Sequence, residues 1–172
     1  MSDVFKKRAK DFRCGSHVHV SPMNNQFTLA ELKEIAFAIV TYEDHVCTIL
    51  PPERRDHNFC KRNTQLSLVL QSHLKEGKSS QALKNVRAAI KRTRDAEELC
   101  ELMQGETRHA LWNFQNTTKG SGTIEFRGGC CLRGIVRTCR WITFVVAFIS
   151  FALEQVSWMN IPSKYFSSPM SV

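Results

Sequence analysis

Two short stretches of strictly alternating polar and apolar residues, far apart in the chain, constrain the fold more than any other feature. The first, GSHVHVS, spans residues 15–21, and the second, GTIEFR, spans residues 122–127. Successive side chains of a strand point to opposite faces, so each stretch would have one polar and one apolar side. Because the apolar sides must be buried, we expect both strands in one antiparallel sheet, with their polar sides on a common face.

The polar side of this expected sheet collects two histidines, a carboxylate and a guanidinium. His17 and His19 would lie about 7 Å apart at Cα, close enough for one metal ion or one polyphosphate to contact both. Glu125 can hold a hard cation, and Arg127 can bind a carboxylate or phosphate through two parallel hydrogen bonds. The residues alone also allow a solvated face with two surface histidines and a cross-strand ion pair.

Apolar residues recur at helical spacing in four regions. The most distinct begins with the capping-box pair Thr28 and Glu31 and ends before two prolines, which predicts a helix over residues 28–49. The other helices are expected at residues 81–92, 95–103 and 137–157. A strand at residues 108–116 would pair with residues 121–127. These elements predict an α+β fold, an antiparallel sheet with helices packed on one of its faces.

Composition and charge set the broad class of the protein. The chain has 172 residues, a net charge of +8 and seven cysteines without a C-x-x-C pair. We expect one domain at residues 14–157, between a charged segment at 1–13 and a loose tail at 158–172. The first segment is charged where a secretion signal needs an apolar run, and the cysteines suit a reducing compartment, so we expect a cytoplasmic protein. The positive charge suits phosphates, an anionic substrate, nucleic acid or an acidic partner.

One apolar segment raises the question of a membrane. Residues 141–153, WITFVVAFISFAL, lie between Arg140 and Glu154 and contain no charge. They are shorter than the roughly 20 residues that span a bilayer. We therefore expect a buried helix of the domain, with a membrane contact as the alternative.

Four motifs, in order along the chain, carry a resemblance to a known enzyme family. They are CGSHVHVS, YEDHVCTILPPERRDHNFC, LWNFQN followed by GTIEFRGG, and RTCRWITFVVAFI. Over residues 14–153 the chain resembles the C-terminal half of the amidoligase family, above all its fungal members. The resemblance implies a partial domain with the glutamine-synthetase-like fold of carboxylate-amine ligases. Such ligases use ATP and Mg²⁺ or Mn²⁺ to phosphorylate a small-molecule carboxylate, and an amine or ammonia then displaces the phosphate.

The resemblance also implies which residues would bind the metal and the nucleotide. His17 and Glu125 correspond to metal ligands of the wider superfamily. His19 and Ser21, from the H-x-H-x-S pattern, correspond to contacts with the ATP phosphates.

Three arginines complete the catalytic residues that the resemblance implies. Arg127, from the E-x-R pattern, would clamp the transferring phosphoryl group or the acyl phosphate. Arg54 and Arg55 resemble family arginines that neutralise phosphate charge, and either of the two could do so. These assignments agree with the chemistry of phosphoryl transfer, in which positioning and charge stabilisation supply most of the rate.

The set of metal ligands in this sequence is short. Ligases of this kind take further glutamates from strands that precede the H-x-H strand, often as E-x-E, and residues 1–13 contain no such pair. Two histidines and one glutamate remain for metals that prefer six or more oxygen ligands. We therefore expect a truncated, split or inactive amidoligase, and a second chain that completes the sheet is one option.

Two other classes of function stay open. The protein could be a basic module that binds nucleic acid or an acidic protein. Its basic residues are scattered and aromatic residues are not interleaved with them, which does not favour a nucleic-acid reader. A zinc hydrolase built on H-x-H would need a third ligand and a general base. The sequence indicates neither the carboxylate substrate nor the amine donor.

Overall fold

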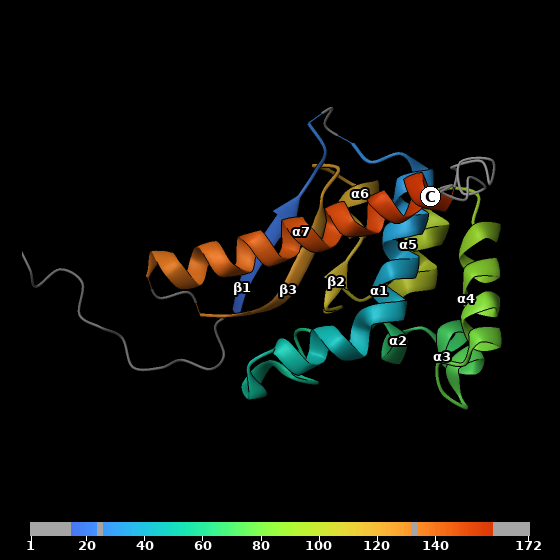
Figure 1. Ribbon diagram of the computed structural model, residues 1–172, viewed down its shortest axis with the longest axis horizontal. Coiled ribbons are helices and arrows are strands. Elements are labelled where there is room, and N and C mark those ends of the chain that lie inside the picture. The colour runs from blue at the N-terminus through green and yellow to red at the C-terminus, as the bar shows by residue number, and fades with distance from the viewer. Residues whose placement is uncertain (1–14, 24–25, 132–133, 160–172) are drawn as a thin grey trace, which may run out of the picture.

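The structure, a computed structural model, describes residues 15–23, 26–131 and 134–159 (Figure 1). It has the predicted α+β fold, a three-stranded antiparallel sheet with helices packed against it. The strands are β1 (Gly15–Val20), β2 (Trp112–Asn113) and β3 (Ile124–Cys130). The helices are α1 (Leu29–Ile49), the 3₁₀ helix η1 (Pro52–Arg54), α2 (Asn63–Leu66), α3 (Leu68–Leu74), α4 (Ser80–Arg92), α5 (Ala96–Gln104), α6 (Gln115–Thr118) and α7 (Ile135–Met159).

The predicted boundaries of the domain lie mostly outside the part of the chain that the structure describes. Residues 1–13 and residues 160–172 lie outside the described part of the chain. The last helix includes residues 158 and 159, which the sequence analysis assigns to the tail.

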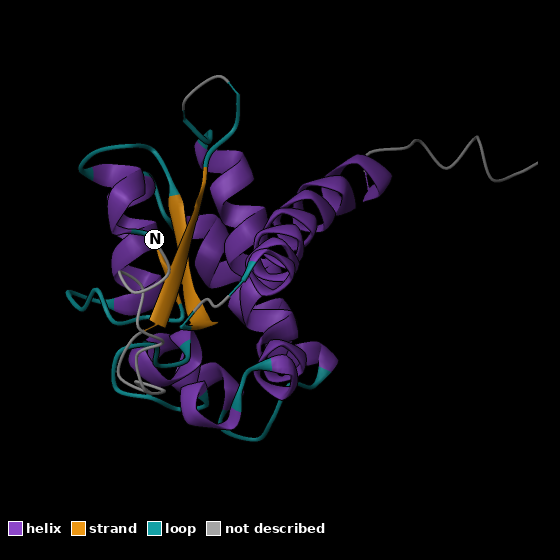
Figure 2. Ribbon diagram, turned by 90° about the vertical axis from the view of Figure 1, so that its left-hand side faces the viewer, coloured by secondary structure: helices purple, strands orange, loops and turns teal. Residues whose placement is uncertain are grey.

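The sheet has the strand order β1–β3–β2, and it confirms the expected pairing of the two alternating stretches. Figure 2 shows the strands grouped on the side that faces the viewer, with helices behind and beside them. The strand predicted at residues 108–116 is much shorter than expected. One reason is that Asn63 takes the place of a neighbouring strand: its side chain accepts a hydrogen bond from the backbone N of Trp112 and donates one to the backbone O of Trp112. The other is that α6 starts just after β2.

Helix α1 confirms the predicted capped helix. The Thr28 hydroxyl accepts a hydrogen bond from the Glu31 backbone N at 3.3 Å, and the Glu31 carboxylate accepts one from the Thr28 backbone N at 2.7 Å. The helix ends at Ile49, just before Pro51 and Pro52, as expected for residues that cannot continue a helix. Helices α4 and α5 are also confirmed, to within a residue at each end, whereas α2 and α3 were not expected.

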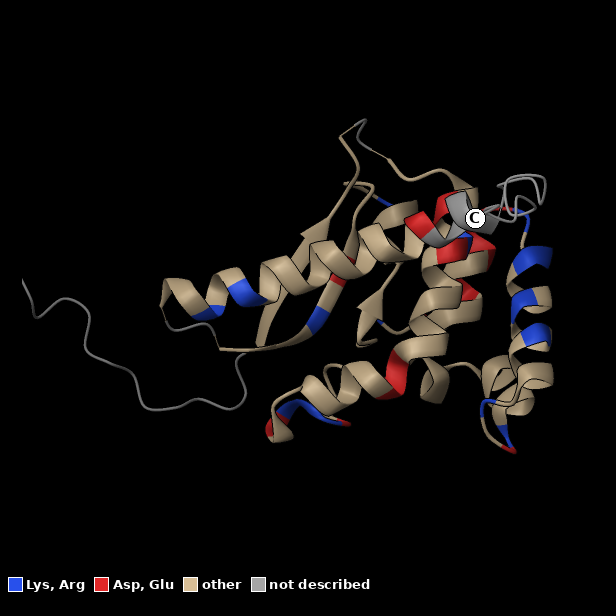
Figure 3. Ribbon diagram, in the orientation of Figure 1, with Lys and Arg blue, Asp and Glu red and all other residues tan. Residues whose placement is uncertain are grey.

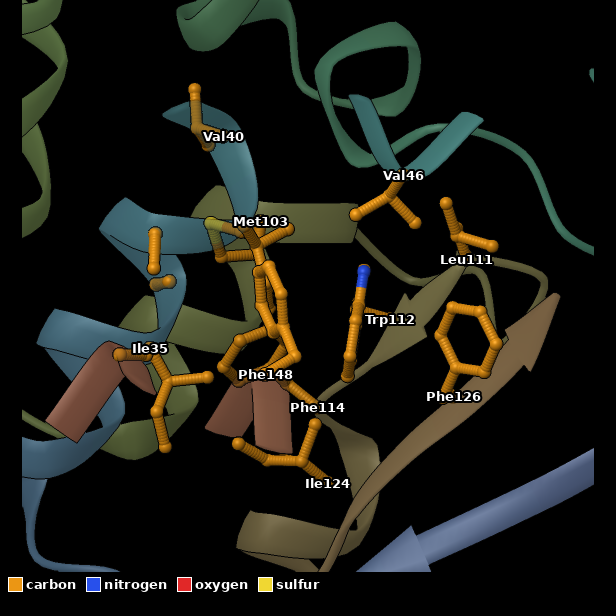
Figure 4. Packing of buried hydrophobic residues seen from close by; sticks show 14 of the residues in the cluster. Ile35, Val40, Val46, Met103, Leu111, Trp112, Phe114, Ile124, Phe126 and Phe148 are labelled. Carbon is orange, nitrogen blue, oxygen red and sulfur yellow. The ribbon is translucent and has the colours of Figure 1, made fainter. Parts of the chain in front are cut away.

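Trp112 lies at the centre of the core between the sheet and α7. Its ring centroid is 4.7 Å from that of Phe126 on β3 and 4.8 Å from that of Phe148 on α7 (Figure 4). Aromatic pairs at such distances contribute about 0.5–1.5 kcal/mol beyond the burial of their surface. The core thus joins β2, β3 and α7 on one face of the sheet and leaves the other face to polar side chains.

Helix α7 is longer and more exposed than the sequence predicts. It crosses the strands in Figure 1, and its buried residues within 135–154 are Val145, Phe148, Ile149 and Ala152. Its large exposed apolar residues include Ile135, Val136, Ile142, Val146 and Phe151. The prediction of a buried helix therefore holds for one side only. Ile135–Glu154 is long and apolar enough to cross a membrane, and only 22% of it is buried, so the membrane alternative stays a prediction.

The capping box allows a test of how much α1 contributes to stability. Thr28→Ala should lower the free energy of unfolding by about 1 kcal/mol, because it leaves the backbone N–H of Glu31 without its acceptor. Thr48→Ala, near the exposed end of the same helix, is the matched control and should change it by less than about 0.5 kcal/mol. Urea unfolding followed by circular dichroism measures both values. Equal losses for the two variants would contradict the assigned helix start.

Candidate active site

The pairing of β1 with β3 brings the predicted polar residues to one face of the sheet. Val18 lies opposite Phe126, and His19 lies opposite Glu125. The register shifts between Ser16 and Val18, so His17 lies at an irregularity of the ladder. A bulge of this kind redirects a side chain while the strand stays paired. The expectation that both histidines and Glu125 share a face is confirmed.

Three side chains converge on a single oxygen of Glu125. Its Oε1 lies 2.7 Å from His17 Nδ1, 2.7 Å from Arg127 Nη1 and 3.6 Å from His19 Nε2. Glu125 is only 4% exposed, and such a carboxylate needs partners because its water has been removed. Figure 3 shows an acidic and a basic position close together on β3. The arrangement is a compact ion cluster between β1 and β3.

Burial lowers the pKa of His17 below its ordinary value, and the positive charge of Arg127 adds to this effect. Glu125 acts in the opposite direction but does not overcome these two causes. The neutral form of the imidazole is therefore favoured at pH 7. Its side chain remains 35% exposed, and that of His19 remains 44% exposed, so both histidines can be reached from solvent.

Arg54 lies beside this cluster as a buried cation. It is 1% exposed, and its Nη2 donates a hydrogen bond to the backbone O of Arg127 at 2.6 Å. The guanidinium packs so closely against β1 that a Cβ at Gly15 would lie 2.6 Å from Nη2. Within the described residues, the Nε of Arg54 has no hydrogen-bond partner. Counted together with Arg54, the cluster sets two guanidinium groups against the one carboxylate of Glu125, so this region is positively charged.

Arg55 and Ser21 do not join this cluster. Arg55 donates hydrogen bonds to the backbone O of Leu50 at 3.0 Å and of Thr48 at 2.8 Å, and so holds the end of α1. Ser21 follows β1 and is exposed. His19, by contrast, belongs to the cluster, and its Nδ1 lies 3.2 Å from the Thr123 hydroxyl.

The sequence analysis missed two buried amides behind Glu125. Asn113 Nδ2 donates to Glu125 Oε2 at 2.8 Å, and Gln104 Nε2 donates to Asn113 Oδ1 at 2.8 Å. The available signal was the polar Asn113 inside the otherwise apolar run LWNF. Gln104 ends a helix and gave no signal.

The cluster is not a preformed metal site. Among residues 15–23, 26–131 and 134–159, no group of three or more His, Cys, Asp or Glu side chains is arranged to hold a metal ion. His17, His19 and Glu125 are close together, but both oxygens of Glu125 already accept hydrogen bonds from side chains. We therefore interpret their proximity as hydrogen bonding rather than as a metal cage.

The lowered pKa of His17 gives the stability of the fold a defined pH dependence. As the pH falls below about 6.5, the unfolded chain binds this proton before the folded chain does. This histidine therefore contributes stability that is complete above pH 6.5 and is lost as the pH falls through its folded pKa. His17→Gln should reduce the loss of unfolding free energy between about pH 7 and pH 5, measured by urea titration. A loss identical to that of the wild type would contradict the assignment.

Comparison with known proteins identifies the family. No curated protein and no solved structure matches the chain. The model of one family, described as "Putative amidoligase enzyme", matches residues 3–149. This match covers most of the chain and includes every residue of the cluster, from His17 to Arg127. The chain therefore belongs to the amidoligase family.

Proposed function

We propose that this protein takes part in ATP-dependent amide-bond formation between a small-molecule carboxylate and an amine or ammonia. The observation that carries the proposal is the convergence of the H-x-H and E-x-R motifs on Oε1 of Glu125 in a chain of this family. The family implies dependence on ATP in general, and a cationic, solvent-accessible cluster is suited to phosphate oxygens.

Arg127 is the side chain that we propose for the transferring phosphoryl group or the acyl phosphate. Its Nη1 is held by Glu125 and its Nε by the backbone O of Phe59 at 3.2 Å, which fixes the plane of the guanidinium. The side chain is 11% exposed. Nη2 is not among the atoms held in this way and would donate to the anion. Fixed donors cost little reorganisation when charge develops on the substrate.

The other proposed contacts surround Arg127. Arg54, rather than Arg55, would neutralise phosphate charge from the buried side, because Arg54 bonds to β3 whereas Arg55 holds the end of α1. His19 and Ser21 would contact the ATP phosphates from the end of β1.

Magnesium or manganese would need ligands beyond those described. His17 and Glu125 do not form a metal site with any third described side chain, so no catalytic step is assigned to a metal here. Because β1 lies at the edge of the sheet, another strand could pair with it and bring carboxylates next to His17. We propose that a second chain, or a segment outside the described residues, completes the site in this way.

Nucleotide binding tests the role of Arg127. Magnesium-ATP should bind the purified protein in the millimolar range. Arg127→Lys, which keeps the charge but loses the planar fork, should weaken binding roughly tenfold or more, as expected for loss of charge-assisted hydrogen bonds. Arg94→Lys is the matched control, because the Arg94 side chain is 84% exposed and forms an ion pair with Glu98, far from β3 in the sequence. Calorimetry that shows no heat for the wild type, or equal binding by both variants, would contradict the proposal.

A turnover assay tests whether the chain alone is sufficient. With ATP, magnesium or manganese, ammonium and a panel of acidic substrates, phosphate release should not exceed the rate without enzyme. Phosphoryl transfer needs metal ions that bridge phosphate oxygens, and the described ligands are too few to hold them. Turnover that disappears in both His17→Ala and Glu125→Ala would support the ligase function and contradict the need for further ligands.

A further inference from the structure

A one-way chain of hydrogen bonds runs through the protein interior to Glu125. The backbone N of Phe114 donates to Gln104 Oε1 at 2.7 Å, and Gln104 Nε2 donates to Asn113 Oδ1 at 2.8 Å. Asn113 Nδ2 then donates to Glu125 Oε2 at 2.8 Å. Gln104 is 1% exposed and Asn113 is 4% exposed, so water does not compete for these bonds. The chain joins the end of α5 to β2 and β3.

The network fixes which end of each amide faces which partner. A backbone N–H can only donate, so Gln104 must present its oxygen to Phe114. Its nitrogen, which also donates to the backbone O of Thr107, then requires an acceptor in Asn113. Asn113 Oδ1 also accepts a hydrogen bond from the backbone N of Gln115 at 3.0 Å. Asn113 is therefore left with its nitrogen toward Glu125, and no step of the chain can be reversed alone.

The end of the hydrogen-bond network at Glu125 determines how His17 is held. With Oε2 bound by Asn113, the carboxylate of Glu125 cannot turn, and Oε1 points toward β1. Arg127 donates to Oε1 at 2.7 Å, and His17 Nδ1 lies at the same distance from it. Because Oε1 can only accept, the proton of the neutral imidazole lies on Nδ1. Nε2 is then unprotonated, and no partner within the described residues binds it.

We propose that Glu125 is a positioning residue that fixes His17 as the Nδ1–H tautomer, with the lone pair of Nε2 available to a ligand, and that Asn113 and Gln104 position Glu125. This proposal differs from the role implied by resemblance, in which Glu125 itself binds the metal. A carboxylate that accepts the second ring N–H of a ligating histidine is a common partner in metal sites. What binds Nε2 rests on the proposed function, whereas the tautomer does not.

A purely structural role for the hydrogen-bond network predicts a different outcome. In that interpretation, the two amides only satisfy buried polar groups, and their loss would lower stability without a defined effect on the His17 ring. The tautomer of His17 therefore distinguishes the two interpretations.

The sharpest test exchanges the carboxylate at position 125 with the amide at position 113. Asn113→Asp alone removes the donor to Oε2 and places two carboxylates in contact. Glu125→Gln alone places two amide donors in contact or turns a donor toward His17 and Arg127. In the double variant, every donor of the network again faces an acceptor. The new amide at position 125 donates to the new carboxylate at position 113 and keeps an oxygen toward His17. It also keeps the net charge of the wild type.

The tautomer is measured on the full chain, labelled with ¹⁵N-histidine, by two-bond ¹H–¹⁵N correlation at about pH 8. His17→Gln identifies the signal of His17, and circular dichroism shows that each variant is folded. In the wild type and in the double variant, Nδ1 should carry the proton in most molecules. Each single variant should lose most of this preference, or else fail to fold. Asn85→Asp, on the exposed side of α4, is the matched control and should leave the signal unchanged.

Two results would overturn the proposal. One is a wild-type His17 that carries its proton on Nε2, a result that does not depend on whether the variants at positions 113 and 125 fold. The other is a folded double variant whose His17 fails to return to the Nδ1–H form. Absence of ATP binding would leave both measurements unchanged, so failure of the proposed function can be told apart from failure of this proposal.

Discussion

The buried carboxylate of Glu125 determines how the three strands are placed. Removing an ionised carboxylate from water costs several kcal/mol unless charged or hydrogen-bonding partners replace the lost water. Here one partner comes from each strand: His17 from β1, Asn113 from β2 and Arg127 from β3 itself. A displacement of either neighbouring strand would leave this charge without a partner. The polar cluster is therefore part of what specifies the fold, as well as being the candidate site.

The apolar face imposes the same register from the other side. Trp112 lies opposite Phe126, and Asn113 lies opposite Glu125. A slip by one residue would exchange the faces, placing an amide in the aromatic core and an indole beside the carboxylate. Gly128 tightens this face further, because a Cβ there would lie 2.6 Å from the ring of Phe126. Core packing and charge pairing therefore favour the same alignment of the strands.

The sequence predicts those parts of the structure that depend on local periodicity. Alternation placed His17 and Glu125 on one face, and the Thr28–Glu31 spacing located the start of α1. Each of these signals is contained in a few consecutive residues. Contacts between distant segments were not predictable in this way. The role of Asn63 beside β2 depends on residues 49 positions apart, and that of Gln104 depends on where α5 ends in space.

The arginines illustrate the same limit. Arg54 and Arg55 are adjacent in sequence and alike in chemistry, so the resemblance could not separate them. The 3₁₀ turn that ends at Arg54 sends this side chain to β3, and Arg55, the residue that follows, to the end of α1. The exposed side of α7 was missed for a related reason, because apolar composition predicts that a helix can be buried but not how much of it is covered.

The position of β1 in the chain has a consequence for synthesis on the ribosome. His19 and its neighbour Thr123 are 104 residues apart, so β1 emerges long before β3 can pair with it. At about 5–20 residues per second, this delay is on the order of 5 to 20 seconds. During that time the strand has both edges open, and its apolar side chains are available to chaperones or to other nascent chains. Contacts of such high sequence separation also form late in folding, so the histidines and Glu125 meet only after most of the helices have been made.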